Sequence, residues 1–170
     1  MTFKLQFWSE SLREPFADMQ SDPEVMADLG GPFSRLDSDK KFDRYRDAWM
    51  ADGISRWAVI DANGSFLRYA GVMKAGGPEH PLSTHFEIGW RFRRDVWGLG
   101  YATHSAKQTL EHAWTVLTVN AIFSYTAPEN LRSQAVMERL KLKRDIARDF
   151  TARYPKGDWS GLVWTAERPL

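Results

Sequence analysis

Apolar side chains recur every three or four positions in several parts of the chain, which is the spacing of one face of an α-helix. In the clearest case, residues 101–117, Ala, Leu and Trp side chains share one face and polar side chains lie away from it, as in a helix packed on a sheet. Ser38 is expected to begin another helix as its N-cap, and Gly53 to end it. Two further helices are expected, one that ends at Gly30-Gly31-Pro32 and one over residues 128–140.

Strands are predicted where apolar and polar positions alternate or where β-branched and aromatic residues gather. Residues 121–126 alternate strictly, and residues 84–92 form a second such run. Asn63-Gly64, between two β-rich runs, is typical of a two-residue hairpin. The last strands are expected over residues 141–150 and 160–167. An antiparallel set followed by strand–helix–strand–helix predicts an α+β (mixed α/β) fold with helices covering a central sheet.

Composition narrows the class of protein. A chain of 170 residues favours a single domain over residues 1–170, and its net charge of +1 argues against a nucleic-acid or acidic-membrane partner. The absence of Cys excludes disulfides and cysteine nucleophiles, and the four His residues make no zinc pattern, so no metal is expected. The sequence contains no apolar run long enough to indicate a signal peptide or a membrane span, so we expect a cytoplasmic protein.

A glycine-rich turn before the helix at residue 101 is the first candidate for chemistry. Gly98 and Gly100 permit a tight turn, and the following helix N-terminus offers unpaired amides and partial positive charge. The amides from about Trp97 to Thr103 can therefore cradle a phosphate, with Arg93 and Arg94 adding charge at the edge. The alternative is a plain turn that joins a strand to a helix.

Two motifs carry a resemblance to a known family. Glu87-Ile88-Gly89-Trp90, followed by Trp97-Gly98-Leu99-Gly100-Tyr101-Ala102-Thr103, resembles the acetyl-CoA-binding segment of the GNAT N-acetyltransferase superfamily. The closest branch contains the ribosomal-protein N-terminal acetyltransferases. The second motif resembles the family's helix after the fifth strand, and its matching positions are Asn130, Ser133, Val136, Glu138 and Leu140. The resemblance covers the chain from about Phe7 to Trp164.

The sequence departs from the family pattern at three places. His104 stands where the family often has Glu, the turn before Trp97 lacks a proline, and Lys141-Leu142 replaces Gly-Phe after the second motif. The usual left-handed glycine cap is therefore missing there.

The resemblance implies a mostly antiparallel central sheet of about six or seven strands flanked by helices, with the fourth and fifth strands splayed apart. Backbone groups of Trp90 and Phe92 would hold the pantetheine arm of acetyl-CoA, and the glycine turn its pyrophosphate. Asn130 would reach the pantetheine, and Ser133 would lie near the thiol. The cofactor-binding residues implied are Trp90, Phe92, Arg93, Arg94, Trp97, Gly98, Leu99, Gly100, Tyr101, Ala102, Thr103, Asn130 and Ser133.

The implied reaction is direct attack of an amine on the thioester, which needs positioning and removal of the ammonium proton. Ser133 is the candidate donor to the departing thiolate, or else a polar residue near a helix terminus. Glu87 is the candidate base, or else a carboxylate paired with Arg. Tyr125 is an alternative acid, or else a core aromatic. An acceptor that arrives neutral needs no dedicated base.

The acceptor site is expected between the N-terminal helices and a last hairpin near residues 154–159. Phe33, Trp49 and Trp159 are candidates to line it, with core packing as the alternative for each. The resemblance implies an acceptor that is either a protein N-terminus or a small-molecule amine, and we expect the protein to be a monomer or a homodimer. A non-catalytic acyl-CoA-binding module with the same fold is the alternative function.

Overall fold

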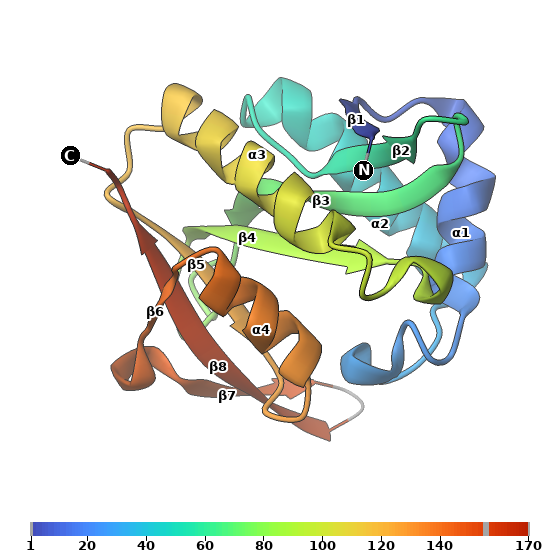
Figure 1. The fold of residues 1–170 in the computed structure, drawn as a ribbon. Coiled ribbons are helices and arrows are strands. Elements are labelled where there is room, and N and C mark those ends of the chain that lie inside the picture. Colours follow the sequence, from blue (N-terminus) through green and yellow to red (C-terminus); the bar gives the residue numbers. More distant parts are fainter. Residues whose placement is uncertain (1, 155–156, 170) are drawn as a thin grey trace.

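The structure, a computed structural model, describes residues 2–154 and 157–169 (Figure 1). The strands are β1 (Phe3–Gln6), β2 (Trp57–Asp61), β3 (Phe66–Ala75), β4 (His85–Phe92), β5 (Ala121–Thr126), β6 (Lys143–Arg144), β7 (Phe150–Tyr154) and β8 (Gly157–Glu167). The helices are α1 (Arg13–Ser21), α2 (Arg35–Ala51), α3 (Tyr101–Val116) and α4 (Leu131–Arg139). Short 3₁₀ turns η1 (Glu10–Leu12), η2 (Ala27–Leu29), η3 (Arg94–Val96) and η4 (Ile146–Arg148) lie between them.

The strands form one sheet in the order β1-β2-β3-β4-β5-β8-β6, and β7 pairs with β8 beyond this path. β4 and β5 run parallel, whereas the other paired neighbours run antiparallel. Helices α1 and α2 cover one face, and α3 and α4 cover the other (Figure 1). The mixed α/β architecture with a mostly antiparallel central sheet, expected from the sequence, is confirmed, with eight strands in the described residues rather than about six or seven.

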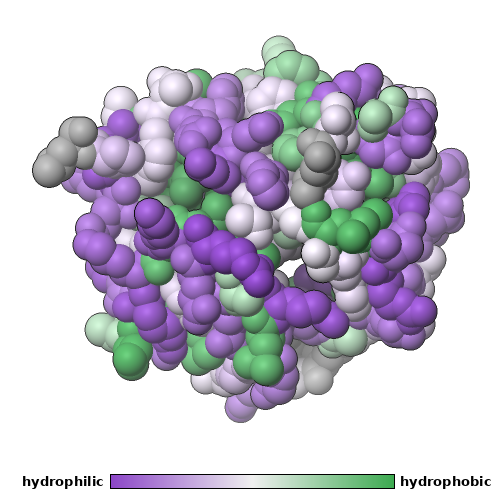
Figure 2. All heavy atoms as spheres, in the orientation of Figure 1, coloured by the Kyte–Doolittle hydropathy of each residue, from purple (hydrophilic) through white to green (hydrophobic). Residues whose placement is uncertain are grey.

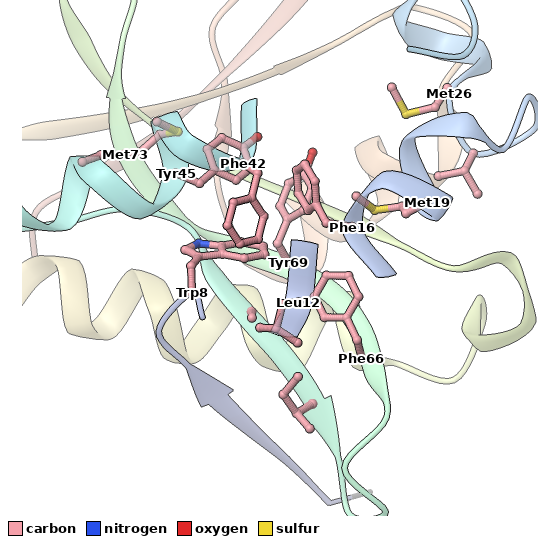
Figure 3. Close-up of a cluster of buried hydrophobic side chains, with 14 residues drawn as sticks. Trp8, Leu12, Phe16, Met19, Met26, Phe42, Tyr45, Phe66, Tyr69 and Met73 are labelled. Atoms are coloured by element: carbon pink, nitrogen blue, oxygen red, sulfur yellow. The ribbon is translucent and has the colours of Figure 1, made fainter. Parts of the chain in front are cut away.

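The core under α1 and α2 is largely aromatic (Figure 3). The Trp8 ring lies 5.3 Å from Phe16 and 5.4 Å from Phe42, and Tyr45 lies 5.2 Å from Tyr69, all in edge-to-face arrangements. Such pairs contribute beyond the area they bury. Because Tyr45 comes from α2 and Tyr69 from β3, this cluster fixes α2 against the sheet and so fixes one wall of the site described below.

Two helix boundaries differ from the expected ones. The first helix ends at Ser21 rather than at Gly30, because Asp22 precedes Pro23 and takes an extended conformation. The second helix begins one turn earlier than expected, with Ser34 as its N-cap. The Ser34 hydroxyl accepts from the Asp37 amide at 3.1 Å and donates to the Asp37 carboxylate at 2.7 Å, whereas Ser38 is buried within the helix.

The hairpin and the C-terminal strands also differ from the expected forms. The turn between β2 and β3 holds three residues rather than two, since Asp61 and Ser65 pair across it and Gly64 takes the left-handed conformation at φ +84°. Residues 141–150 are not one strand. They form the helix cap, the two-residue β6 and η4, and β7 starts only at Phe150. The expected hairpin near residues 154–159 is the β7–β8 turn, of which residues 155 and 156 lie outside the described residues.

The end of α4 keeps its left-handed cap without glycine. Lys141 has φ +60°, its amide donates to Glu138 O at 2.9 Å, and the Leu142 amide donates to Met137 O at 3.0 Å. These are the two hydrogen bonds of a Schellman motif. A lysine therefore occupies the position that usually takes glycine.

Candidate active site

β4 and β5 diverge near the middle of the sheet. They are in register at Glu87 and Phe123, and the Ser124 hydroxyl donates to Ile88 O at 2.9 Å. Beyond this point the described residues show no further pairing between the two strands. Because strand residues two apart face the same edge, Trp90 and Phe92 direct their backbone groups toward the opening, as Ile88 does toward β5. The strand separation expected from the resemblance is present.

One of these open backbone groups is already used. The Trp97 indole donates to Phe92 O at 2.9 Å, which folds the turn after β4 back onto the strand end. Within the described residues, this leaves the backbone groups of Trp90 and the amide of Phe92 on the open edge. An extended ligand with amide groups can pair with such an edge as an added strand does.

The glycine turn has the backbone expected of it. Gly98 and Gly100 have φ of +77° and +85°, and Gly100 is the N-cap of α3. The first helical bond runs from the His104 amide to Gly100 O at 3.1 Å, so the amides at positions 101–103 have no acceptor within the helix. The first turn of α3 carries no acidic residue. This end of α3 therefore suits an anion.

The arginines near the turn are arranged differently from the expectation. Arg93 pairs with Asp95 at 2.9 Å, and Arg94 pairs with Glu24, so both guanidinium groups are already engaged by carboxylates. Arg132, which the motifs did not single out, lies 3.7 Å from the centre of the Trp97 ring. It comes from the first turn of α4, and its position just after Asn130 in the second motif was the available signal.

A cavity of about 860 Å³ lies on the opening between the strands. Residues 28–45 supply one wall, and the remaining walls come from β3, β4, β5, the start of α4 and the start of β8. Figure 2 shows an opening in the molecular surface near the place where β4 and α4 lie in Figure 1. Six of the candidate residues line the cavity: Phe33, Glu87, Trp90, Tyr125, Ser133 and Trp159.

Trp49 does not line this cavity. Its ring lies 4.4 Å from Trp57 and 4.8 Å from Phe7, and 6.5 Å from His112 of α3. The expectation that it contributes to an acceptor site is therefore not met. Trp49 lies near the C-terminal end of α2 and packs across the start of β2 instead.

Glu87 forms an ion pair with a buried arginine. Arg56 Nη2 donates to Glu87 Oε2 at 2.8 Å, and Arg56 Nη1 donates to Glu87 O at 2.9 Å and to Gly71 O. Burial lowers the pKa of Arg56, but Glu87 and the nearby tyrosines together raise it by more, so the net shift is upward and the guanidinium stays charged. A Cβ at Gly89 would lie 2.9 Å from Arg56 Nη2, which explains the glycine of the first motif. Glu87 Oε1 has no hydrogen-bond partner among the described residues.

Tyr125 contacts a histidine that the sequence motifs missed. The Tyr125 hydroxyl lies 3.3 Å from His85 Nε2, and His85 Nδ1 lies 2.9 Å from Ser83 O. If Nδ1 donates to that carbonyl, Nε2 is the nitrogen that accepts from the tyrosine. His85 is buried, unlike an ordinary surface histidine. Its signal in the sequence was a shared strand face with Glu87.

The second motif places Asn130 and Ser133 at the start of α4. Asn130 Oδ1 accepts from the Ser133 amide at 3.1 Å, and Asn130 Nδ2 donates to Asp28 Oδ2 at 3.1 Å. Both ends of the amide are therefore occupied by protein groups. The Ser133 hydroxyl makes no hydrogen bond in the part of the chain that the structure describes, and Ser133 lines the cavity.

Asp28 joins several elements around the cavity. Its carboxylate pairs with Arg91 Nη1 at 2.7 Å and with Asn130, and its carbonyl accepts from the Trp159 indole at 3.3 Å. Arg91 also donates to Val25 O. One residue thus links the segment before α2 to β4, to α4 and to β8. No motif or spacing in the sequence points to this role.

A comparison with protein families matches residues 3–143 to the acetyltransferase (GNAT) domain. The chain belongs to the GNAT acetyltransferase family. This GNAT chain is 32% identical over 73 residues to "Uncharacterized N-acetyltransferase YnaD" of Bacillus subtilis (strain 168). That match covers 43% of this chain and 42% of the relative, so it spans less than half the relative's length.

Solved GNAT structures share the fold. An acetyltransferase from Agrobacterium tumefaciens str. C58 superposes with a TM-score of 0.79 at 22% identity, over 97% of this chain and 90% of that one. A spermidine N-acetyltransferase from Vibrio cholerae, solved with CoA and spermine, has a TM-score of 0.73 at 14% identity, over 98% and 95% of the two chains. Identities this low show the fold alone. The ribosomal-protein branch of the GNAT superfamily is not confirmed by these matches.

Metal clusters and membrane-spanning helices are absent from the described part of this GNAT chain. Among these residues, no group of three or more His, Asp or Glu side chains is placed to hold a metal ion. In the same residues, no helix combines the length and apolar character that a bilayer crossing requires.

Proposed function

We propose that this GNAT protein is an N-acetyltransferase that transfers an acetyl group from acetyl-CoA directly to an amine. The observation that carries the proposal is the opening between β4 and β5, with a cavity on it and a glycine turn at the end of β4. The cavity presents the Glu87, Tyr125 and Ser133 side chains together. Family membership supports acyl transfer, and the arrangement of these residues supports an amine as the acceptor.

The binding elements fit coenzyme A. The amides at positions 101–103 and the absence of acidic residues in the first turn of α3 suit a pyrophosphate. The Trp90 backbone on the open edge of β4 suits the amide groups of a pantetheine arm. Arg132, stacked on Trp97, supplies a guanidinium on the same side as the turn, in place of the engaged Arg93 and Arg94. Acetyl-CoA supplies an acetyl thioester when it is bound.

Glu87 is the residue that we assign to proton removal. Its Oε2 is held by Arg56, which fixes the carboxylate in the cavity wall, and its Oε1 is available to accept a proton directly or through water. Tyr125 and His85 form a second path, in which Tyr125 lines the cavity and its hydroxyl contacts His85 Nε2, a nitrogen that can take up a proton.

Ser133 is the residue that we assign to the departing thiolate. Ser133 lines the cavity, and its hydroxyl is not engaged by another protein group in the described residues. Its amide is held by Asn130, so the side chain is fixed at the start of α4. A hydroxyl donor there stabilises negative charge as it develops on sulfur.

The test is release of free CoA from acetyl-CoA in the presence of amines. The panel contains peptides with free N-termini, amino acids, an aminoglycoside and spermidine, the last because one structural neighbour is a spermidine N-acetyltransferase. We expect at least one class to give an acetylated product detected by mass spectrometry. Binding of acetyl-CoA with no acetylated product from any class would favour the non-catalytic acyl-CoA-binding module. Absence of binding would remove both functions.

A further inference from the structure

The cavity wall formed by α2 carries cations that have no carboxylate partner. Lys40, Lys41 and Arg44 all line the cavity, and none of them forms an ion pair within 4.0 Å in the described residues. They lie within five consecutive residues of one helix, so their charges act on the same side of the cavity. None of the three belongs to the two sequence motifs.

The acidic residues of the same cavity are, by contrast, already engaged. Three of them form ion pairs: Glu87 with Arg56 at 2.8 Å, Asp28 with Arg91 at 2.7 Å, and Asp158 with Arg153 at 3.0 Å. The fourth, Asp37, accepts a hydrogen bond from the neutral Ser34 hydroxyl at 2.7 Å and has no ion pair among the described residues. Three cations on α2 therefore face one carboxylate without a cation partner, that of Asp37, so the cavity keeps an excess of positive charge on the α2 side.

Lys41 is the most confined of these cations. Its Nζ lies 5.0 Å from the centre of the Phe33 ring, 5.8 Å from Tyr69 and 5.9 Å from Tyr45, and all three rings also line the cavity. Burial lowers the pKa of this lysine, and the nearby cations Arg91 and Arg44 lower it further. Cation–π contacts offset only part of the free-energy cost of keeping this ammonium group charged where it is buried. A charged group kept in such a place is stabilised when an anion binds beside it.

We propose that the acceptor is a small amine that also carries a carboxylate, and that Lys41, with Arg44, binds the carboxylate. This inference rests on the proposed function and names the substrate class for the same site. The acceptor amine then lies toward Glu87 on β4, and its carboxylate lies toward α2. A cavity of about 860 Å³ is in the range of small-molecule sites, so both ends fit within it. Polycationic amines meet like charges on α2 and are disfavoured.

The experiment compares amines that differ by one carboxylate. The pairs are lysine with cadaverine, ornithine with putrescine, and phenylalanine with phenethylamine, each assayed for CoA release at fixed acetyl-CoA. We expect kcat/KM to be at least about tenfold higher for the carboxylate-bearing member of each reactive pair. Equal or higher values for the decarboxylated members overturn the inference while leaving the proposed function intact.

The variant Lys41→Met tests whether Lys41 causes the preference for carboxylate-bearing amines. Lys41→Met should lower kcat/KM for phenylalanine by about 10- to 100-fold, because a charge-assisted hydrogen bond is lost, and leave phenethylamine within about twofold. It should also raise the melting temperature of the free protein, since a confined cation is removed. Lys107→Met, on the exposed face of α3, is the control and should change neither value. Equal losses for both amines would mean that Lys41 only shapes the cavity, and would overturn the inference.

If no amine is acetylated, the proposed function fails, and calorimetric binding of the same pairs decides the inference separately. Tighter binding of phenylalanine than of phenethylamine to the wild-type protein, with the difference lost in Lys41→Met, would support it. No difference in wild-type binding would overturn it.

Discussion

Replacement of Gly98 by valine tests whether the turn before α3 binds acetyl-CoA. Gly98 has φ +77°, and a side chain there would point into open space, since nothing lies within 4 Å of an ideal Cβ. The expected damage is therefore backbone strain and obstruction of the approach to the turn, not a clash inside the protein. Strain of this kind costs about 2 kcal/mol, which lowers the melting temperature by about 4–8 °C for a chain of this size.

Gly53→Val is the matched control for this strain. Gly53 follows α2 with φ +70°, and it too has nothing within 4 Å of an ideal Cβ. The two variants should lose similar stability without ligand. Only Gly98→Val should also lose cofactor affinity, because only Gly98 lies in the turn before α3.

The expected ligand effect is large enough to measure. Acetyl-CoA at about 100 times its dissociation constant stabilises the wild type and Gly53→Val by about 2.7 kcal/mol, or about 5–10 °C. If Gly98→Val binds about 100-fold more weakly, the same concentration gives about 0.4 kcal/mol, or about 1 °C. The assay is differential scanning fluorimetry over a range of acetyl-CoA concentrations. Equal ligand-induced shifts in the two variants would refute the assignment of the turn.

Three further predictions concern catalysis and stability. Ser133→Ala should lower kcat at least about tenfold and leave acetyl-CoA affinity within about twofold, since Asn130 caps α4 by accepting from the Ser133 amide and the hydroxyl takes no part in the cap. Wild-type turnover in a steady-state assay would remove Ser133 from the mechanism. Lys141→Gly should raise the free energy of unfolding, measured in urea, by about 0.5–1 kcal/mol, because glycine adopts the left-handed conformation of residue 141 without steric strain. An unchanged or lower free energy of unfolding would contradict this. Hydrogen bonds from Arg13 and ion pairs lower the pKa of Glu10 from 4.5 to about 2. Their contribution to the free energy of unfolding is therefore complete above pH 4.5 and is lost as the pH falls toward 2. Acid unfolding of Glu10→Gln should show less of this pH dependence, and an unchanged profile would count against the ion pair.

Local signals predicted the parts of the structure that depend on local chemistry. The alternation in residues 121–126 indicated β5 and its faces, and the glycines at 98 and 100 have the positive φ that a turn into a helix requires. Where two local signals competed, the sequence could mislead. Ser34 and Ser38 both suit an N-cap, and Ser34 prevails because Asp37 stands three residues after it and completes the cap.

The contacts that make the site were not predictable from local patterns. Arg56 is separated from Glu87 by 31 residues, and His85 from Tyr125 by 40. No periodicity or spacing rule connects such pairs, because they are brought together by the order of strands in the sheet. Trp49 shows that a suitable residue type does not by itself place a side chain in the site. Its residue type suits a binding site, but its place at the end of α2 directs it to Trp57 and not to the cavity.

The contacts of Asp28 determine when the active site can form during synthesis of the chain. Asp28 meets Asn130 across 102 positions of the chain and Trp159 across 131. During synthesis, the full set of Asp28 contacts can therefore form only after nearly the whole polypeptide has been produced. Closing such long loops is slow and comes late in folding. A truncated or stalled chain can assemble the aromatic cluster under α1 and α2, but it cannot complete the cavity between β4 and β5. No partly synthesised copy therefore carries a complete active site.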